Sequence, residues 1–232
     1  MMESPDEFQK QLGSALQLGA ATLHEALGQR GALDPEIKPI DPSMKLAGPA
    51  YTVQCPRADN LMLHHALTRA RPGDVLVVDA GGYAGAGPWG DILTLAAQTL
   101  GLAGLVIDGA IRDSADIVQS RFPVFARGIC LRGTSKNKPG CVGQPIACGG
   151  ILIHPGDLIV GDRDGLVVIP KAEASRTIAL GEQRASAEES MRRAVRDGRT
   201  TVELLGLGPR LHEMGYDCAA ANGKEDCGAH RD

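Results

Sequence analysis

Between residues 50 and 127 strand-like and helical patterns alternate, and this alternation restricts the fold more than any other feature of the chain. Short apolar runs predict four strands, over 50–55, 75–79, 104–108 and 123–127. Helical patterns lie between them, over 58–70, 91–100 and from Asp113 onward. Strands that are separated by helices can pair in parallel, because a parallel connection needs a crossover. The sequence therefore predicts an α/β fold with parallel pairing in this region.

The segments on either side of this region have other patterns. Leucines at helical spacing predict one or two helices over 6–30, and a Pro-rich irregular connection follows over 31–46. Residues 139–169 contain short β-like runs that Gly and Pro interrupt, which predicts an antiparallel or mixed half.

The last part of the chain is predicted to be helical and polar. A long charged helix over 171–197 has only a thin apolar stripe, so we expect it on the surface or crossing onto another subunit. A short helix is expected over 201–214. Because no linker or internal repeat interrupts the sequence, we expect one domain over 1–216 and a flexible tail over 217–232.

Composition limits the classes of partner. The net charge is −4 without a long basic run, and aromatic residues make up 3% of the chain, so a nucleic-acid partner is not expected. No apolar run reaches membrane-spanning length, and the N-terminal residues lack a signal-peptide core. We therefore expect no membrane partner and a cytoplasmic location. The six cysteines form no C-x-x-C pair, which favours reduced thiols.

Polar residues follow two neighbouring predicted strands. Asp91 comes after the loop that follows the strand 75–79, and Arg112-Asp113 follows the strand 104–108. The carboxyl ends of strands are where α/β proteins bind ligands, and two carboxylates with a guanidinium suit a divalent cation and an anionic substrate. A purely structural interpretation also fits: the two aspartates can cap helices, and Arg112 can form a surface ion pair.

The Gly-rich loop over 81–90 permits two interpretations. Its last six residues fit G-x-G-x-x-G, and Asp108 ends the next strand, which is formally a dinucleotide fingerprint. However, Pro88 and Trp89 are bulky where a phosphate would approach, and too few βα units remain for that fold. The simpler interpretation is that Gly90 lets a small carboxylate approach the amides that follow it, those of Asp91, Ile92 and Leu93.

Two further polar residues are candidates for the same edge of the sheet. Lys136 lies in a Gly-flanked turn and can supply a second cation for a polycarboxylate, or it can simply be exposed. Asn60 starts a predicted helix and can hydrogen-bond a substrate or cap that helix.

Asp91, twenty intervening residues and Arg112-Asp113 together form a D-x20-R-D motif. With this motif the chain resembles the class II pyruvate aldolases that cleave 4-hydroxy-4-methyl-2-oxoglutarate and 4-carboxy-4-hydroxy-2-oxoadipate. They belong to an RraA-like superfamily that includes the regulator of ribonuclease E activity A. The resemblance covers nearly the whole chain, and further segments support it: Asp59-Asn60, 71–78, Trp89-Gly90-Asp91, 133–136 and 155–170.

The resemblance implies an RraA-like αββα sandwich with a mixed sheet, assembled as a homotrimer or a dimer of trimers with active sites between subunits. It implies that Asp113 binds Mg²⁺ or Mn²⁺ and that Asp91 holds a water on the metal. Arg112 and the amides from Gly90 to Leu93 would bind the pyruvyl part, and Asn60 and Lys136 would line the pocket. A glutamate of a neighbouring subunit would complete the site, with Glu188 the best match and Glu189 the alternative.

The activity implied by the resemblance is that of a carbon–carbon lyase. A 4-hydroxy-2-oxo dicarboxylic or tricarboxylic acid would be cleaved to pyruvate and a second 2-oxo acid. Oxaloacetate decarboxylation would be a side activity through the same enolate, and breakdown of aromatic acids is a possible setting. The alternative is a non-catalytic regulator of ribonuclease E that acts by binding protein. A nucleotide-dependent enzyme using the Gly-rich loop is a third hypothesis.

Overall fold

The computed structural model describes residues 5–216 and divides into two compact units, the first ending at Ala185 and the second beginning at Ser186. Helix α5 (Ala174–Arg196) contributes to both units. The predicted tail over 217–232 lies outside the described residues, and a single domain over 1–216 stays a prediction. None of the described helices is long and apolar enough to span a membrane.

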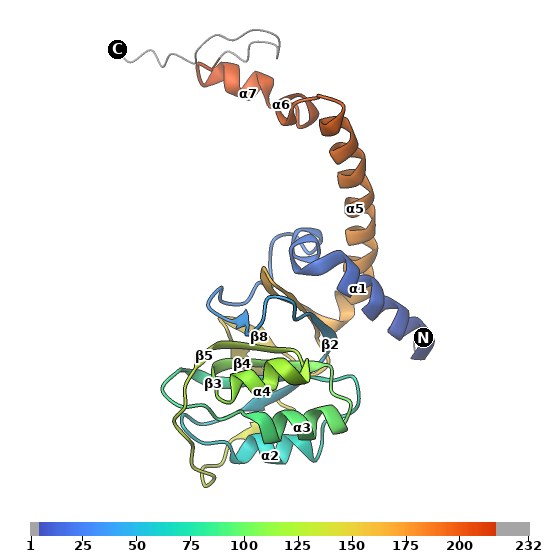
Figure 1. Cartoon of the computed structure of the whole chain (residues 1–232). Coiled ribbons are helices and arrows are strands. Elements are labelled where there is room, and N and C mark those ends of the chain that lie inside the picture. Colours follow the sequence, from blue (N-terminus) through green and yellow to red (C-terminus); the bar gives the residue numbers. More distant parts are fainter. Residues whose placement is uncertain (1–4, 217–232) are drawn as a thin grey trace, which may run out of the picture. The chain divides into compact units, whose positions relative to one another are not determined.

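The first unit is built on a mixed sheet whose strands are ordered β1-β5-β4-β3-β2-β9-β10, with β6 paired to β2. Figure 1 labels four of these strands, β2 to β5, together with the helices α2, α3 and α4. Its long strands are β2 (Leu46–Gln54), β3 (Val75–Tyr83), β4 (Gly104–Ile111) and β5 (Val124–Ile129). These four strands are parallel to one another, and one helix connects each to the next: α2 (Leu61–Leu67), α3 (Asp91–Thr99) and α4 (Ser114–Ser120). The alternation predicted from the sequence is thereby confirmed.

The remaining strands are short and pair antiparallel. They are β1 (Lys38–Pro39), β6 (Cys141–Val142), β7 (Ile146–Cys148), β8 (Ile151–Ile153), β9 (Leu158–Asp162) and β10 (Gly165–Ile169). Strands β7 and β8 form a hairpin of their own. Strand β2 joins two parts of the sheet, because residues 46–49 pair antiparallel with β9 and residues 50–54 pair parallel with β3. The mixed half predicted over 139–169 is therefore confirmed.

Three apolar cores lie between the layers of the first unit. The first core lies between helices α2–α4 and the parallel strands β2–β5. The second lies between these parallel strands and a layer formed by the short strands β7–β10, of which β9 and β10 continue the main sheet. A third lies between α1 (Pro5–Ala26) and the outer side of β9 and β10. Along β3, Leu76 and Val78 belong to the first core, on the side of the helices, whereas Val75 and Val77 belong to the second core, on the other face of the strand. Because this strand is buried on both faces, it is a continuous apolar run. The layer order is the predicted αββα.

Helix α1 is kinked at Gly19, which answers the open question of one or two helices over 6–30. Gly19 has φ 78° and ψ 166°, a conformation that interrupts the helix and favours glycine. The carboxylate of Asp162 accepts a hydrogen bond from the Ala20 amide at 2.8 Å. This contact satisfies an amide that the kink removes from the helical ladder, so a residue of β9 fixes the bend.

The second unit contains the end of α5, α6 (Thr201–Leu204) and α7 (Gly208–Glu213). The single helix predicted over 201–214 is divided, because Gly206 between the two helices has φ 63°. Thr200 caps α6 through a reciprocal pair of hydrogen bonds with Glu203.

Candidate active site at the carboxyl ends of the parallel strands

The end of β4 positions Arg112 and Asp113. Asp113 has a left-handed backbone, with φ 55° and ψ 39°, which is uncommon for a residue other than glycine and is concentrated at functional sites. It occupies the cap position of α4, but its side chain makes no capping hydrogen bond. Its carboxylate lies 3.2 Å from Arg112 Nε. Asp113 thus holds the predicted cap position without capping the helix through its side chain, and its carboxylate forms with Arg112 the surface ion pair that the structural interpretation expected.

The start of α3 lies directly against this pair. Gly90, not Asp91, is the N-cap residue, so the interpretation of Asp91 as a helix cap is wrong. The Asp91 amide donates to Asp113 Oδ2 at 3.4 Å. A Cβ atom at position 90 would overlap Asp113 Oδ2 and stand 3.1 Å from Arg112 Nε. The absence of a side chain at Gly90 is thus what allows the helix start to approach Asp113, so Arg112, Asp113 and the backbone of Asp91 lie together.

A buried tryptophan, for which the sequence predicted no structural role, fixes the start of α3. Trp89 is fully buried, and its indole N–H donates to Thr94 Oγ1 at 2.7 Å. Thr94 Oγ1 in turn donates to the Gly90 carbonyl at 3.0 Å, while the Arg112 amide donates to the Trp89 carbonyl at 2.8 Å. The sequence feature that could have predicted this role is the tryptophan itself, because a buried indole N–H requires a hydrogen-bond acceptor nearby.

The backbone amides expected to bind a carboxylate belong to the first turn of α3. Amides in the first turn of a helix lack intrahelical acceptors and carry the positive end of the helix dipole. The side chain of Ile92 is 67% exposed, whereas Leu93 is buried. Any contribution of these two residues to anion binding therefore comes from their amides, and the Asp91 amide already faces a carboxylate.

Asn60 is buried beside the Gly-rich loop. It stands at the cap position of α2 without a capping hydrogen bond, so the capping alternative is excluded. Its Nδ2 donates to the Pro88 carbonyl at 2.9 Å, two residues before Gly90. Among the described residues its Oδ1 has no hydrogen-bond partner. An unsatisfied buried acceptor is unfavourable, so a donor from a bound molecule or water would stabilise this arrangement.

Lys136 lies on an exposed loop at the same edge of the sheet. The loop is joined to the start of α2, because the Asn60 amide donates to the Ser135 carbonyl at 3.0 Å. Its other end reaches the guanidinium, since a Cβ atom at Gly133 would stand 3.7 Å from Arg112 Nη1. Burial and the neighbouring Lys136 charge both lower the pKa of His64. Lys136 is exposed, as one alternative held, and other residues of its loop lie beside Asn60 and Arg112.

The carboxylate oxygens of this site are ligands that a hard divalent cation prefers, but they are few. Within residues 5–216 no group of three His, Cys, Asp or Glu side chains has the arrangement of a metal site. Asp113 offers a carboxylate beside the backbone of Asp91, an exposed residue, and Mg²⁺ is commonly held by one or two carboxylates with several waters. The residues present therefore fit Mg²⁺ or Mn²⁺ with further oxygen ligands from elsewhere.

The two candidate glutamates belong to the second unit. Glu188 forms an ion pair with Arg192 at 3.1 Å, and Glu189 forms pairs with Arg192 and Arg196 at 3.4 and 3.6 Å. Glu188, together with Met191, Arg192, Val195 and Arg196, lines a hollow on α5. Within this unit the two glutamates differ in surroundings, and only Glu188 lines the hollow.

The interpretation of Asp108 as a dinucleotide ligand is not supported by its contacts. Asp108 is buried, pairs with Arg127 and accepts the Gly149 amide at 2.9 Å through its second oxygen. Arg127 also pairs with Asp34 and Glu36, both at 2.7 Å. Because both oxygens of Asp108 are engaged, the residue serves a structural network that was not predicted from the sequence. No local pattern links these residues, which come from four separate segments of the chain.

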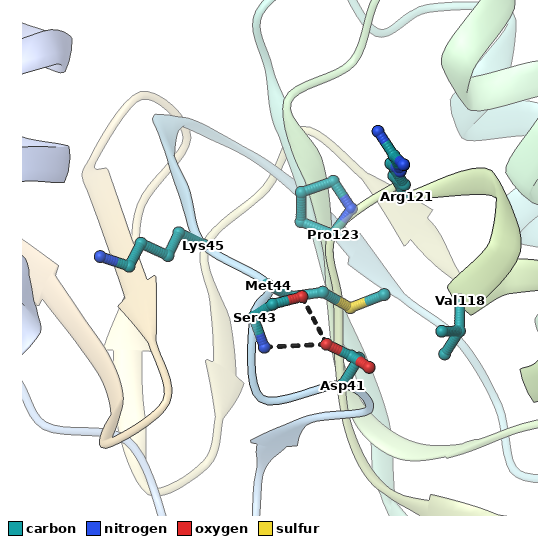
Figure 2. A pocket seen from close by; sticks show the side chains of 7 residues that line it. All are labelled: Asp41, Ser43, Met44, Lys45, Val118, Arg121 and Pro123. Carbon is teal, nitrogen blue, oxygen red and sulfur yellow. Dashed lines mark hydrogen bonds between the residues drawn. The ribbon is translucent and has the colours of Figure 1, made fainter.

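Another hollow lies at the opposite edge of the sheet, where α4 ends and β5 begins. It is lined by Asp41, Ser43, Met44, Lys45, Val118, Arg121 and Pro123 (Figure 2). Asp41 is engaged by the Ser43 amide and hydroxyl, which hold the pKa of the Asp41 carboxyl below its usual value. The side chains of Lys45 and Arg121 extend in different directions in Figure 2. This hollow therefore lacks the convergence of charged groups found beside Asp113.

Comparison with known proteins places the chain in a family. Residues 20–168 match the model of the RraA-like family, described as Aldolase/RraA. The chain belongs to the RraA-like family. A relative from Halalkalibacterium halodurans is 41% identical over 175 residues, which cover 75% of this chain and 83% of the relative. That relative is named "Putative 4-hydroxy-4-methyl-2-oxoglutarate aldolase".

Solved structures of RraA-like proteins have the same fold. The Streptomyces coelicolor protein RraAS2, titled an unusual member of the RNase ES inhibitor RraA family, is 32% identical with a TM-score of 0.73. The match covers 80% of this chain and 98% of that one. The RNA-processing inhibitor RraA from Thermus thermophilis is 27% identical with a TM-score of 0.61, over 66% and 92% of the two chains. The family contains both names, so the family alone does not choose between aldolase and inhibitor.

Proposed function

We propose that this protein is a divalent-metal-dependent aldolase. It would cleave a 4-hydroxy-2-oxo dicarboxylic or tricarboxylic acid to pyruvate and a second 2-oxo acid, and it would decarboxylate oxaloacetate as a side activity. The observation that carries the proposal is the position of the Asp113 carboxylate. It is held by a left-handed backbone, makes no capping bond, and lies against both Arg112 and the first amide of α3.

Each residue around Asp113 supports a separate part of this reaction. A Mg²⁺ or Mn²⁺ ion held by Asp113 would supply Lewis-acid stabilisation of a 2-keto oxygen. The Arg112 guanidinium would stabilise the negative charge that develops on the pyruvyl part as the C3–C4 bond breaks. The free amides at the start of α3 would orient the substrate carboxylate. Asp91 would hold a water that accepts the proton of the 4-hydroxyl group and returns a proton to C3 of the pyruvyl part, which completes pyruvate.

Asn60 and Lys136 would bind the rest of the substrate. The unpartnered Oδ1 of Asn60 would accept a hydrogen bond from a hydroxyl group, and the Lys136 cation would attract a distal carboxylate. A polar site of this kind discriminates against substrates that lack the matching group, because buried polar groups would then be left without partners.

The decisive experiment measures pyruvate release from 4-hydroxy-4-methyl-2-oxoglutarate and from oxaloacetate, with Mg²⁺ or Mn²⁺ and then with excess EDTA. We expect release that requires the metal and returns when the metal is restored. Asp113→Ala should abolish release while the protein keeps its circular dichroism spectrum. The matched control is Asp116→Ala, which removes an exposed carboxylate from the first turn of the same helix. Absence of metal-dependent release from both substrates would refute the proposal.

The second candidate function is inhibition of a ribonuclease by protein binding. It is supported by the structural likeness to RraA proteins whose titles name that role. The two functions make different predictions for Asp113→Ala, because a binding surface tolerates loss of one metal ligand. Inhibition of ribonuclease E by the wild-type protein and by Asp113→Ala alike, without any pyruvate release, would favour the second candidate.

We further propose that the active form is a homotrimer or a dimer of trimers in which Glu188 reaches a site on a neighbouring copy. Asp113→Ala and Glu188→Gln should each be inactive alone but regain part of the activity when the two variants are mixed and reassembled. Glu189→Gln is the control and should keep its activity. Equal loss in Glu189→Gln, with Glu188→Gln active, would assign the role to Glu189 instead.

A further inference from the structure

One buried carboxylate ties the loop over 133–138, which carries Lys136, to the start of α2. Asp59 is fully buried and immediately precedes Asn60. Its Oδ1 accepts the Leu61 amide at 2.9 Å. Its Oδ2 accepts three donors of the loop: the Ser135 hydroxyl at 2.6 Å, the Asn137 amide at 2.8 Å and the Lys138 amide at 3.2 Å. The carboxylate thus satisfies the helix start and the loop together.

The backbone reinforces this connection. The Ser135 amide donates to the Ala58 carbonyl at 2.9 Å, and the Ser135 carbonyl accepts the Asn60 amide at 3.0 Å. Ala58 has φ 56°, a left-handed conformation that is unfavourable for alanine. A strained residue persists only where its surroundings fix it, and such residues are concentrated at functional sites. The strain here turns the chain so that Ala58 and Asp59 both face the loop.

The carboxylate is held in its charged form. Burial by itself raises the pKa of Asp59, but the hydrogen bonds from Asn137, Ser135, Leu61 and Lys138 outweigh it and lower the pKa to about 2. The carboxylate is therefore ionised at any pH at which the protein would be assayed. Hydrogen bonds to a charged acceptor are about twice as strong as neutral ones, so this carboxylate is a strong anchor of the loop.

The anchored loop reaches both cationic candidates of the site. Its middle carries Lys136, and the segment ahead of it places Gly133 beside the Arg112 guanidinium. We propose that Asp59 is a positioning residue that fixes the loop over 133–138, which carries Lys136 and whose first residue, Gly133, lies beside Arg112. Asp59 itself is too deeply buried to touch a substrate. The kinetic part of this inference rests on the proposed aldolase function.

Asp59→Asn tests the inference in the full-length protein, because the asparagine side chain has only one acceptor oxygen. We expect the KM for 4-hydroxy-4-methyl-2-oxoglutarate to rise about tenfold or more while kcat falls less, since substrate-positioning contacts are lost. We expect hydrogen exchange at the Asn137 and Lys138 amides to become at least about tenfold faster, because their acceptor is weakened. Exchange in β4 should stay unchanged.

The matched control is Asp157→Asn. Asp157 is also buried, and it accepts the amides of His154 and Lys171 at 2.9 and 3.0 Å in the turn before β9. It should change neither the KM nor the exchange of the loop by more than about twofold. Ser135→Ala removes one of the donors to Asp59 and should change both measurements in the same direction by a smaller factor. If Asp59→Asn does not fold, Ser135→Ala replaces it as the test variant.

The possible outcomes are distinct. Unchanged exchange in the loop of Asp59→Asn or Ser135→Ala would overturn the inference, and so would faster exchange with unchanged KM and kcat. An equal rise of the KM in Asp157→Asn would also overturn the inference, because the weaker substrate binding would then follow from the loss of any buried carboxylate. If the wild-type protein releases no pyruvate, the proposed function fails, but the exchange comparison needs no turnover and still decides whether Asp59 holds the loop.

Discussion

Replacing Gly90 with alanine should separate activity from stability. The backbone of Gly90 is extended, with φ −152° and ψ −166°, and alanine adopts this conformation without strain. The added Cβ atom, however, would overlap Asp113 Oδ2 and stand 3.1 and 3.2 Å from Arg112 Nε and Cγ. Both neighbours are side chains rather than backbone. Movement of the Asp113 carboxylate and the Arg112 side chain can therefore relieve the overlap, with little change in the free energy of unfolding.

The size of the effect follows from this overlap. To restore an ordinary van der Waals separation, the Asp113 carboxylate has to move by on the order of 1 Å. Misplacement of a catalytic group by about 1 Å reduces rates roughly 100-fold, which is about 2.7 kcal/mol in the activation free energy. The free energy of unfolding should change by less than about 1 kcal/mol, because no backbone strain or buried polar loss accompanies the change.

The assay compares kcat/KM for metal-dependent pyruvate release with the free energy of unfolding in urea. Gly133→Ala is the control, because its added Cβ atom would lie 3.7 Å from Arg112 Nη1, an ordinary contact with the same guanidinium. We expect the control to keep kcat/KM within about twofold. Full activity in Gly90→Ala would refute the reasoning, and so would a loss of activity that only follows a loss of folded protein.

Three further predictions concern the supports of the site. Arg127→Ala leaves Asp108 buried without its ionic partner and should lower the free energy of unfolding in urea by about 3 kcal/mol. Thr94→Val removes the acceptor of the buried Trp89 indole and should cost about 1–3 kcal/mol in the same assay. The folded pKa of Asp59, about 2, lies below the usual value for an aspartate because four hydrogen bonds stabilise its charged form. Its contribution to stability should therefore be complete above about pH 4 and disappear between about pH 4 and 2, and the stability gap between wild type and Asp59→Asn should narrow over that range.

The elements that carry the site were predictable because their signals are local. The apolar run ending β3 and the helical pattern that begins at Asp91 are properties of neighbouring residues, and so is the run that leads to Arg112 and Asp113. Parallel pairing then brings the ends of β3 and β4 to one edge of the sheet. The identity of the cap residue of α3 was missed, because glycine and aspartate are both common at that position.

The sequence by itself determined the alternation of strands and helices, the parallel centre of the sheet and the edge at which Asp91, Arg112 and Asp113 meet. Only the tertiary structure decided which atoms meet there. The Asp91 amide faces Asp113 because Gly90 has no side chain, and Asp59 holds a loop more than seventy residues away in the sequence. Asp108 pairs with Arg127 instead of facing a ligand. Such contacts join distant segments through packing and hydrogen-bond satisfaction, and the periodicity of a local sequence contains no information about either.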